Sequence, residues 1–232
     1  MTTLDAPAHT LQIAGLEPFS SVDWPGKLAA TLFLQGCPWK CTYCHNVEII
    51  DCATPGQVAW DRVLELLQRR RGLLDAVVFS GGEPTRQAGL LDGIGQVKDL
   101  GYQVGLHTAG PYPRRLEQVL ELVDWVGLDI KATPEKYRAI TGVQRSAATA
   151  YQALDMVLQA QVPLQVRTTL DPTVLTVEDV ALVQREVARR GVGRPGPDGV
   201  CRSEHVIQQV RSTGVSPAYA QALSQVEPLA LG

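Results

Sequence analysis

Three cysteines that lie close together are the strongest chemical feature of this sequence. They stand in the segment Cys37-Pro-Trp-Lys-Cys41-Thr-Tyr-Cys44. A loop of this size can turn three thiolates toward one point. Three sulfurs can hold a four-iron cluster at three of its irons and leave the fourth iron open to a ligand, as catalytic zinc sites keep one coordination position open. The spacing therefore predicts an iron–sulfur site with Cys37, Cys41 and Cys44 as its ligands.

A structural zinc ion is the alternative for the same cysteines. Such a site needs a fourth ligand, and His45 and Cys52 are the candidates. His45 directly follows Cys44, so both could reach one ion only with strain. Cys52 stands at a spacing that matches no common zinc pattern. We expect Cys52 and Cys201 to be free thiols of a reducing compartment.

Composition and charge exclude several other classes of protein. The chain has 232 residues, of which 45% are hydrophobic and 19% charged, as in an ordinary globular protein. The net charge of −3 provides no basic excess, so we expect neither a nucleic acid nor a membrane as partner. The N-terminus lacks the pattern of a signal peptide, and no apolar run is long enough to span a bilayer. With an odd number of cysteines, these features predict a cytoplasmic protein.

Short apolar runs alternate with amphipathic stretches along the chain. The runs that predict strands are 28–34, 76–80, 102–106, 125–130 and 164–169. Helical patterns occupy 58–71, 90–100, 114–123, 147–160 and, after a capping box that starts at Thr176, the stretch up to Arg190. Strands that alternate with helices predict right-handed crossovers and a parallel sheet in an α/β fold. We expect one domain over 1–232, with its core at about 16–190.

The segment after the last predicted helix breaks this rhythm. A sixth strand is due there, but residues 191–199 contain four glycines and two prolines, which is the composition of a loop. The sixth strand is therefore expected to be weak or missing. We expect 191–232 to be a loop and a C-terminal tail, loosely held from Ser212 onward.

A glycine-rich turn follows the second predicted strand, in the segment Ser80-Gly81-Gly82-Glu83-Pro84. Two glycines let the backbone approach a ligand closely, and an amide-rich turn can bind charged groups. The Glu83 carboxylate could bind an ammonium group. Taken alone, the segment is also compatible with a plain strand-to-helix turn.

Charged residues also stand at the ends of later strands. Asp129 and Lys131 are two apart on the fourth strand, so their side chains share a face. Inward charges are costly unless paired or used, and the carboxyl edge of a parallel sheet is where ligands bind. The alternative is an Asp–Lys pair without a ligand. Arg167 lies on an inward polar face of the fifth strand, and His107 ends the third strand, where a lone histidine is more often structural than catalytic.

Together these motifs resemble the radical S-adenosylmethionine (SAM) superfamily, in particular the activating enzymes of glycyl radical enzymes. The resemblance spans about 16–170. The matching segments are the cysteine triplet with its Cys-His-Asn ending at Asn46, Ser-Val-Asp-Trp-Pro-Gly at 21–26, Gly-Gly-Glu-Pro at 81–84 and Asp-Ile-Lys at 129–131.

The resemblance implies a fold and two cofactors. The fold would be a partial, open parallel (β/α) barrel with the cysteine loop after its first strand. Cys37, Cys41 and Cys44 would bind a [4Fe–4S] cluster. The residues implied for SAM are Tyr43 (against the adenine), Gly81, Gly82, Glu83, Asp129, Lys131 and Arg167.

The resemblance also implies a reaction and a partner. The reduced cluster would cleave SAM, and the resulting radical would take a hydrogen atom from a glycine of the partner enzyme, with no residue of this chain acting as acid or base. A flavodoxin-type protein would donate the electron. The favoured partner is the anaerobic ribonucleoside-triphosphate reductase, because the chain is short and His107 replaces an aspartate of pyruvate formate-lyase activases. The alternatives are an activase of the pyruvate formate-lyase type, a small radical enzyme of modified-nucleoside synthesis, and a metal-binding module without catalysis.

Overall fold

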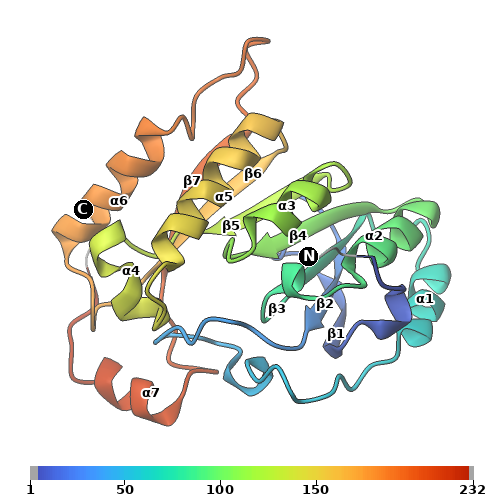
Figure 1. Ribbon diagram of the computed structural model, residues 1–232, viewed down its shortest axis with the longest axis horizontal. Helices are drawn as coiled ribbons and strands as arrows, with labels where there is room; N and C mark the ends of the chain where they lie inside the picture. Colours follow the sequence, from blue (N-terminus) through green and yellow to red (C-terminus); the bar gives the residue numbers. More distant parts are fainter. Residues whose placement is uncertain (1–4, 230–232) are drawn as a thin grey trace.

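A single curved sheet of seven strands forms the centre of the molecule (Figure 1). This computed structural model describes residues 5–229. The strands lie side by side in chain order: β1 Ile13–Ser20, β2 Ala29–Leu34, β3 Ala76–Gly81, β4 Gln103–Thr108, β5 Trp125–Asp129, β6 Leu164–Leu170 and β7 Ser203–Gln209. β1 runs antiparallel to β2, and every later pair is parallel. β1 and β7 end the sheet without pairing to each other, so the barrel is partial and open, as predicted.

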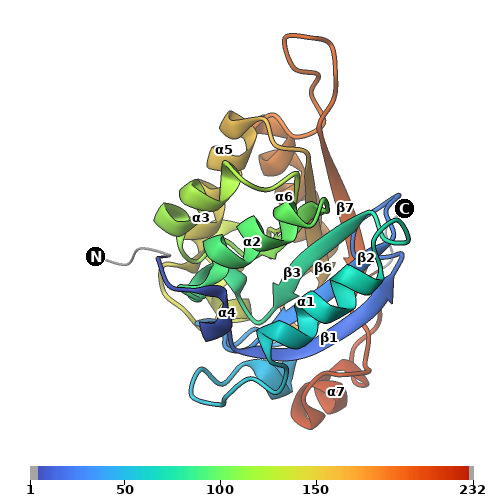
Figure 2. The ribbon, with the colours of Figure 1, turned by 90° about the vertical axis from the view of Figure 1, so that its right-hand side faces the viewer.

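Helices connect the parallel strands and cover the outer face of the sheet. They are α1 Trp60–Arg69, α2 Leu90–Asp99, α3 Pro113–Leu120, α4 Pro134–Thr141, α5 Ser146–Ala160 and α6 Val177–Arg189. A further helix, α7 Pro217–Leu223, follows β7. Three single-turn 3-10 helices accompany them: η1 Ala8–Thr10, η2 Val47–Ile49 and η3 Pro84–Arg86. Figure 2 shows α2, α3 and α5 on the same side of the sheet. The capping box predicted at Thr176 is present, with reciprocal bonds to Asp179 at the start of α6.

The five predicted strands are all present, and their apolar residues explain the packing. β3 is buried over its first five residues, and β5 over its first four. Such continuous burial is expected of parallel strands covered on both faces. Fully buried side chains such as Phe79, Leu106 and Leu128 belong to one continuous core between the sheet and the helices.

The prediction of a weak or missing sixth parallel strand is wrong. Residues 191–199 form turns, as their glycines and prolines suggest, but β7 follows a few residues later. It pairs with β6 in unbroken parallel register from Leu164–Ser203 to Leu170–Gln209. β7 is an edge strand with no fully buried residue, so its polar sequence carries no apolar pattern that could reveal it.

The prediction of a loosely held tail from Ser212 is also wrong. The segment contains α7, whose Tyr219 is only 6% exposed. Ser216 caps this helix by accepting a hydrogen bond from the backbone N–H of Tyr219. The stretch 191–229 therefore contributes both an edge strand and a packed helix to the fold.

A second, smaller apolar cluster closes the barrel at the amino end of its strands. Trp24, from the loop between β1 and β2, stacks on Trp125 at a ring distance of 5.3 Å. Ala29, Ala76 and Val78 complete this cluster.

Candidate active site

The cysteine loop follows β2 and is fastened on two sides through its backbone. On one side, Cys37 N–H donates to the carbonyl oxygen of Ile50 at 2.9 Å. On the other side, Thr42 N–H donates to the carbonyl of Ile140, at the end of α4, also at 2.9 Å. The loop therefore has a defined position although it contains no helix or strand.

The three thiols share partial burial and the electrostatic influence of Lys131. Cys37, Cys41 and Cys44 are each half-buried. Burial raises the pKa of all three thiols, that of Cys37 to about 12, while the Lys131 ammonium opposes this rise in each case. Cys41 also interacts electrostatically with Cys37 and Cys44. The thiols are thus neutral without metal, and metal binding must displace their protons.

Two of the thiols border a cavity that has room for a cluster. Cys37 and Cys41 line a cavity of about 620 Å³. Within residues 5–229, no three His, Cys, Asp or Glu side chains are arranged to hold one metal ion. A four-iron cluster binds each cysteine at a separate iron, whereas zinc draws all its ligands to one point. The exposed Cys52 lines the same cavity, while the exposed Cys201 lies before β7. The assignment of individual ligands stays a prediction.

Gly81 and Gly82 let two backbone segments meet at the carboxyl edge. A Cβ on Gly81 would lie 2.2 Å from the backbone nitrogen of Leu34, and one on Gly82 would lie 2.4 Å from the carbonyl oxygen of Gly36. Gly81 also has a φ of +113°, which favours glycine. Because Glu83 N–H donates to the carbonyl of Gly36, the glycine-rich turn and the cysteine loop form one unit.

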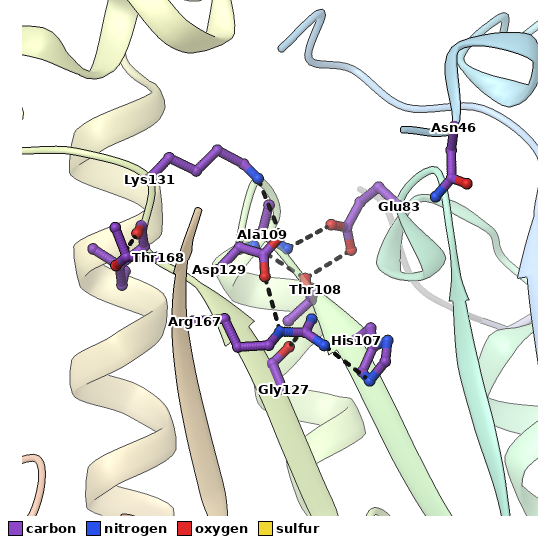
Figure 3. A network of polar contacts seen from close by, with 12 residues as sticks. Asn46, Glu83, His107, Thr108, Ala109, Gly127, Asp129, Lys131, Arg167 and Thr168 are labelled. Atoms are coloured by element: carbon purple, nitrogen blue, oxygen red, sulfur yellow. Dashed lines mark hydrogen bonds and ion pairs between the residues drawn. The ribbon is translucent and has the colours of Figure 1, made fainter. Parts of the chain in front are cut away.

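Glu83 is fully buried and joins the ends of β3 and β4 (Figure 3). Its Oε1 accepts hydrogen bonds from the N–H and hydroxyl of Thr85 and from the hydroxyl of Thr108, at 3.1, 2.5 and 2.8 Å. Its Oε2 accepts one from Ala109 N–H at 3.0 Å. Burial raises the pKa of this carboxyl, and the four bonds oppose the rise. Glu83 therefore holds the glycine turn in place, and its contact with a ligand ammonium stays a prediction.

Asp129 lies between two cations at the end of β5. Its Oδ2 is 3.1 Å from Lys131 Nζ, and its Oδ1 is 3.1 Å from Arg167 Nε (Figure 3). Burial opposes ionisation of Asp129, but Lys131 and Arg167 lower its pKa to about 2. Lys131 Nζ also lies 5.4 Å from the ring centroid of the buried Tyr43, inside the cysteine loop. The predicted Asp–Lys pair is thus present and stands next to the thiols, and the use of these residues and Arg167 for SAM stays a prediction.

His107 is buried and contacts three neighbouring segments, and its structural role stays a prediction. Burial and the nearby Arg167 lower the pKa of His107 to about 3, so the ring is neutral. Nε2 lies 2.7 Å from the carbonyl oxygen of Asp23 and 3.2 Å from Arg167 Nη1. Nδ1 lies 3.0 Å from the Ser80 hydroxyl. His107 thereby ties the loop before β2 to the end of β3.

Three polar contacts at this edge were not predicted. Thr108 and the N–H of Ala109 hold Glu83, and the Asn46 amide lies 3.4 Å from the carbonyl oxygen of Gly81. The position of Thr108 and Ala109 directly after a strand could have indicated a place at the carboxyl edge. A contact made by a backbone N–H does not depend on the residue type, so the sequence does not reveal it.

Comparison with known protein families gives the class. The family model of the radical SAM superfamily matches residues 31–192, so the chain belongs to this superfamily. Its members use a [4Fe–4S] cluster and SAM, so this protein is a radical SAM enzyme with these two cofactors. The predicted superfamily, fold class and cofactors are confirmed.

Within the superfamily, the chain is similar to activating enzymes. It is 28% identical over 195 residues, 75% of each chain, to a Methanocaldococcus jannaschii protein provisionally named a glycyl-radical enzyme activating enzyme. It is 34% identical over 137 residues to the pyruvate formate-lyase-activating enzyme of Clostridium pasteurianum, covering 56% of this chain and 57% of the other. The predicted resemblance to glycyl-radical-enzyme activases is confirmed.

Solved structures share the fold at low identity. QueE from Escherichia coli aligns with 94% of this chain and 88% of its own, at a TM-score of 0.51 and 16% identity. SuiB from Streptococcus suis bound to SAM aligns with 80% of this chain and 40% of its own, at a TM-score of 0.59 and 13% identity. No helix within residues 5–229 is long and apolar enough to cross a membrane.

Proposed function

We propose that this protein activates a glycyl radical enzyme, and that the anaerobic ribonucleoside-triphosphate reductase is its partner. The observation that carries the proposal is the carboxyl edge of the open sheet, where Lys131, paired with Asp129, contacts the ring of Tyr43 inside the cysteine loop. The similarity to activating enzymes supports the same function. The open side between β1 and β7 supports it too, because a glycine of a partner protein must reach the site.

The chain's own residues would bind and orient the cofactors. When bound, the reduced cluster and SAM supply a radical that can take a hydrogen atom from a glycine Cα of the partner. Cys37, Cys41 and Cys44 hold the cluster. Lys131 and Asp129 present a fixed pair of charges beside it, and this pair needs no reorganisation when a charged ligand arrives.

The other residues proposed for SAM serve it in different ways. Gly81 and Gly82 keep the turn close to the cysteine loop. Glu83 orients that turn, and its Oε2 accepts a single hydrogen bond from residues 5–229. Arg167 keeps Asp129 ionised. Tyr43 contributes a buried ring beside Lys131 for the adenine.

The choice of reductase rests on His107. An aspartate at this place would add a negative charge next to Asp129, whereas His107 is neutral and bonded at both ring nitrogens. The site therefore departs from the one expected of pyruvate formate-lyase activases. The alternative partner is pyruvate formate-lyase, favoured by the similarity to its activating enzymes. A flavodoxin-type donor and a cytoplasmic location complete the proposal.

Electron paramagnetic resonance on protein mixtures tests the partner. The protein is reconstituted with iron and sulfide without oxygen, then mixed with SAM, dithionite and each candidate enzyme. We expect a glycyl radical doublet on the anaerobic reductase. A doublet on pyruvate formate-lyase alone would overturn the choice of partner, and no doublet on either enzyme would count against the activase function.

A further inference from the structure

A buried carboxylate links the cysteine loop to the C-terminal helix. Asp171 directly follows β6 and has no exposed surface. Its Oδ2 accepts a hydrogen bond from the hydroxyl of Thr42, between the second and third cysteines, at 2.5 Å. Its Oδ1 accepts one from the Tyr219 hydroxyl, on α7, at 2.8 Å. The N–H and hydroxyl of Thr173 add two more bonds at 3.0 and 2.6 Å, so the carboxylate is well fixed.

A second contact fastens the other end of the same loop. His45, directly after the third cysteine, places Nε2 3.1 Å from the carbonyl oxygen and 3.3 Å from the N–H of Arg211. A few residues further on, a Cβ on Gly214 would lie 2.9 Å from the carbonyl oxygen of His45. The backbone at 211–214 therefore lies directly against the end of the cysteine loop.

The same C-terminal segment also borders the cavity of the thiols. Ser216, which caps α7, lines this cavity together with Cys37 and Cys41. The contacts at Thr42 and His45 join residues that are 129 and 166 positions apart in the chain. The contacts at Thr42 and His45 therefore hold the chain on both sides of Cys44.

We propose that residues 211–219 and Asp171 form a clamp that positions the cysteine loop. Asp171, Tyr219 and Arg211 act on the loop through Thr42 and His45, so they are positioning residues. The loop lacks regular secondary structure, and side-chain bonds of a buried carboxylate are the means by which such a segment can be held in one geometry. The clamp's effect on the cluster rests on the function proposed above.

Two conservative substitutions with matched controls test the clamp. Tyr219→Phe removes one bond to Asp171 and keeps the ring, while Tyr102→Phe removes a buried hydroxyl that donates to the carbonyl of Leu67, away from the site. Gly214→Ala adds a Cβ against His45 at a φ of +83°. Gly193→Ala carries similar backbone strain, at a φ of +80°, with nothing within 4 Å of the added Cβ.

Hydrogen–deuterium exchange of the metal-free protein gives a readout independent of the cofactors. We expect exchange over residues 38–46 to rise roughly tenfold in Tyr219→Phe, because a bond to the Asp171 carboxylate is lost. We expect the same rise in Gly214→Ala, because the added Cβ displaces the backbone of His45. The two control substitutions should not change hydrogen–deuterium exchange in this loop. Equal exchange in the variants and their controls would overturn the clamp, whether or not the native protein binds a cluster.

The reconstituted protein gives a second readout. We expect Tyr219→Phe to lose iron to a ferrous chelator roughly tenfold faster than Tyr102→Phe and to show an altered cluster resonance on addition of SAM. Loop exchange that rises while iron loss and resonance stay native would overturn the clamp's role at the cluster. A native protein that binds no cluster would instead reject the proposed function.

Discussion

At the scale of single residues, the site depends on charges that the protein pairs away from water. Lys131 is nearly buried, and burial would lower its pKa, but Asp129 holds it well above the usual value. Breaking one member of such a pair leaves the other charge uncompensated. Substitutions that remove a charge here therefore need a separate measurement of folding.

The cysteines give the first prediction at this scale. Ala at Cys37, Cys41 or Cys44 should abolish retention of the cluster, because each removes the ligand of one iron. Cys52→Ala and Cys201→Ala are the matched controls, since both thiols are exposed. Iron and sulfide are counted after anaerobic reconstitution. Loss of the cluster in Cys52→Ala to the same degree as in the triplet would contradict the ligand assignment.

Lys131→Gln separates SAM binding from cluster binding. The variant should retain its iron, because Lys131 ligates no metal, but bind SAM at least about tenfold more weakly, as expected for one charge-assisted contact. Equilibrium binding of SAM to the reconstituted protein measures the change. Lys98→Gln, which alters a half-exposed pair with Asp124, is the control. Unchanged SAM affinity in Lys131→Gln would reject the placement of SAM.

The lowered pKa of His107 predicts that the stability of the fold depends on pH. Its folded pKa of about 3 lies below the ordinary value of 6.5, so between these values the unfolded chain binds a proton that the folded chain does not. The histidine's contribution is therefore complete above pH 6.5 and falls as the pH drops toward 3, by at most about 1.4 kcal/mol per pH unit. The difference in unfolding free energy between pH 7 and pH 5, measured with urea, should be smaller for His107→Gln than for the native chain. An equal difference in both proteins would contradict this.

At the scale of elements, the parallel strands are important because their carboxyl ends form one common edge of the sheet. The register pairs Leu34 with Gly81 and Asp129 with Arg167. The motifs on different strands therefore lie side by side along the same edge of the sheet. This explains how residues far apart in the chain form a single site. It also means that the fit between adjacent turns is as important as their side chains.

Gly82→Ala tests this fit between turns. The added Cβ would lie 2.4 Å from the carbonyl oxygen of Gly36 and push the glycine turn away from the cysteine loop. We expect a loss of about 1–3 kcal/mol in unfolding free energy, together with weaker SAM binding. Gly95→Ala in α2, with nothing within 4 Å of its Cβ, should instead gain about 0.5–1 kcal/mol. The free energy of unfolding of both variants is measured by chemical denaturation. Similar values for Gly82→Ala and Gly95→Ala would contradict the close approach of the glycine turn to the cysteine loop.

The sequence predicts the parallel strands and the residues of the carboxyl edge, because apolar runs and rare motifs reflect burial and chemistry directly. It does not reveal β7, whose residues lie at an edge with no buried face. β1 is hidden for a similar reason, since register irregularities interrupt its pairing and Pro18 lies within it. α7 was missed because its attachment depends on Tyr219 and Asp171, which are far apart in sequence.

The whole molecule combines a closed end with an open side. The stacked Trp24 and Trp125 close the amino end of the barrel, while β1 and β7 remain apart (Figures 1 and 2). Access to the thiols is therefore from the carboxyl edge and the open side. This arrangement suits an enzyme that shields a radical while a protein segment enters.

Reductive cleavage of SAM by the isolated protein tests the central claim most directly. The protein is reconstituted anaerobically, its cluster content is confirmed, and 5′-deoxyadenosine is measured after addition of SAM and dithionite. The account predicts 5′-deoxyadenosine and methionine from the native protein and from Cys52→Ala, and neither product from Cys41→Ala. A native protein that carries a full complement of cluster, binds SAM and forms no 5′-deoxyadenosine would contradict the account.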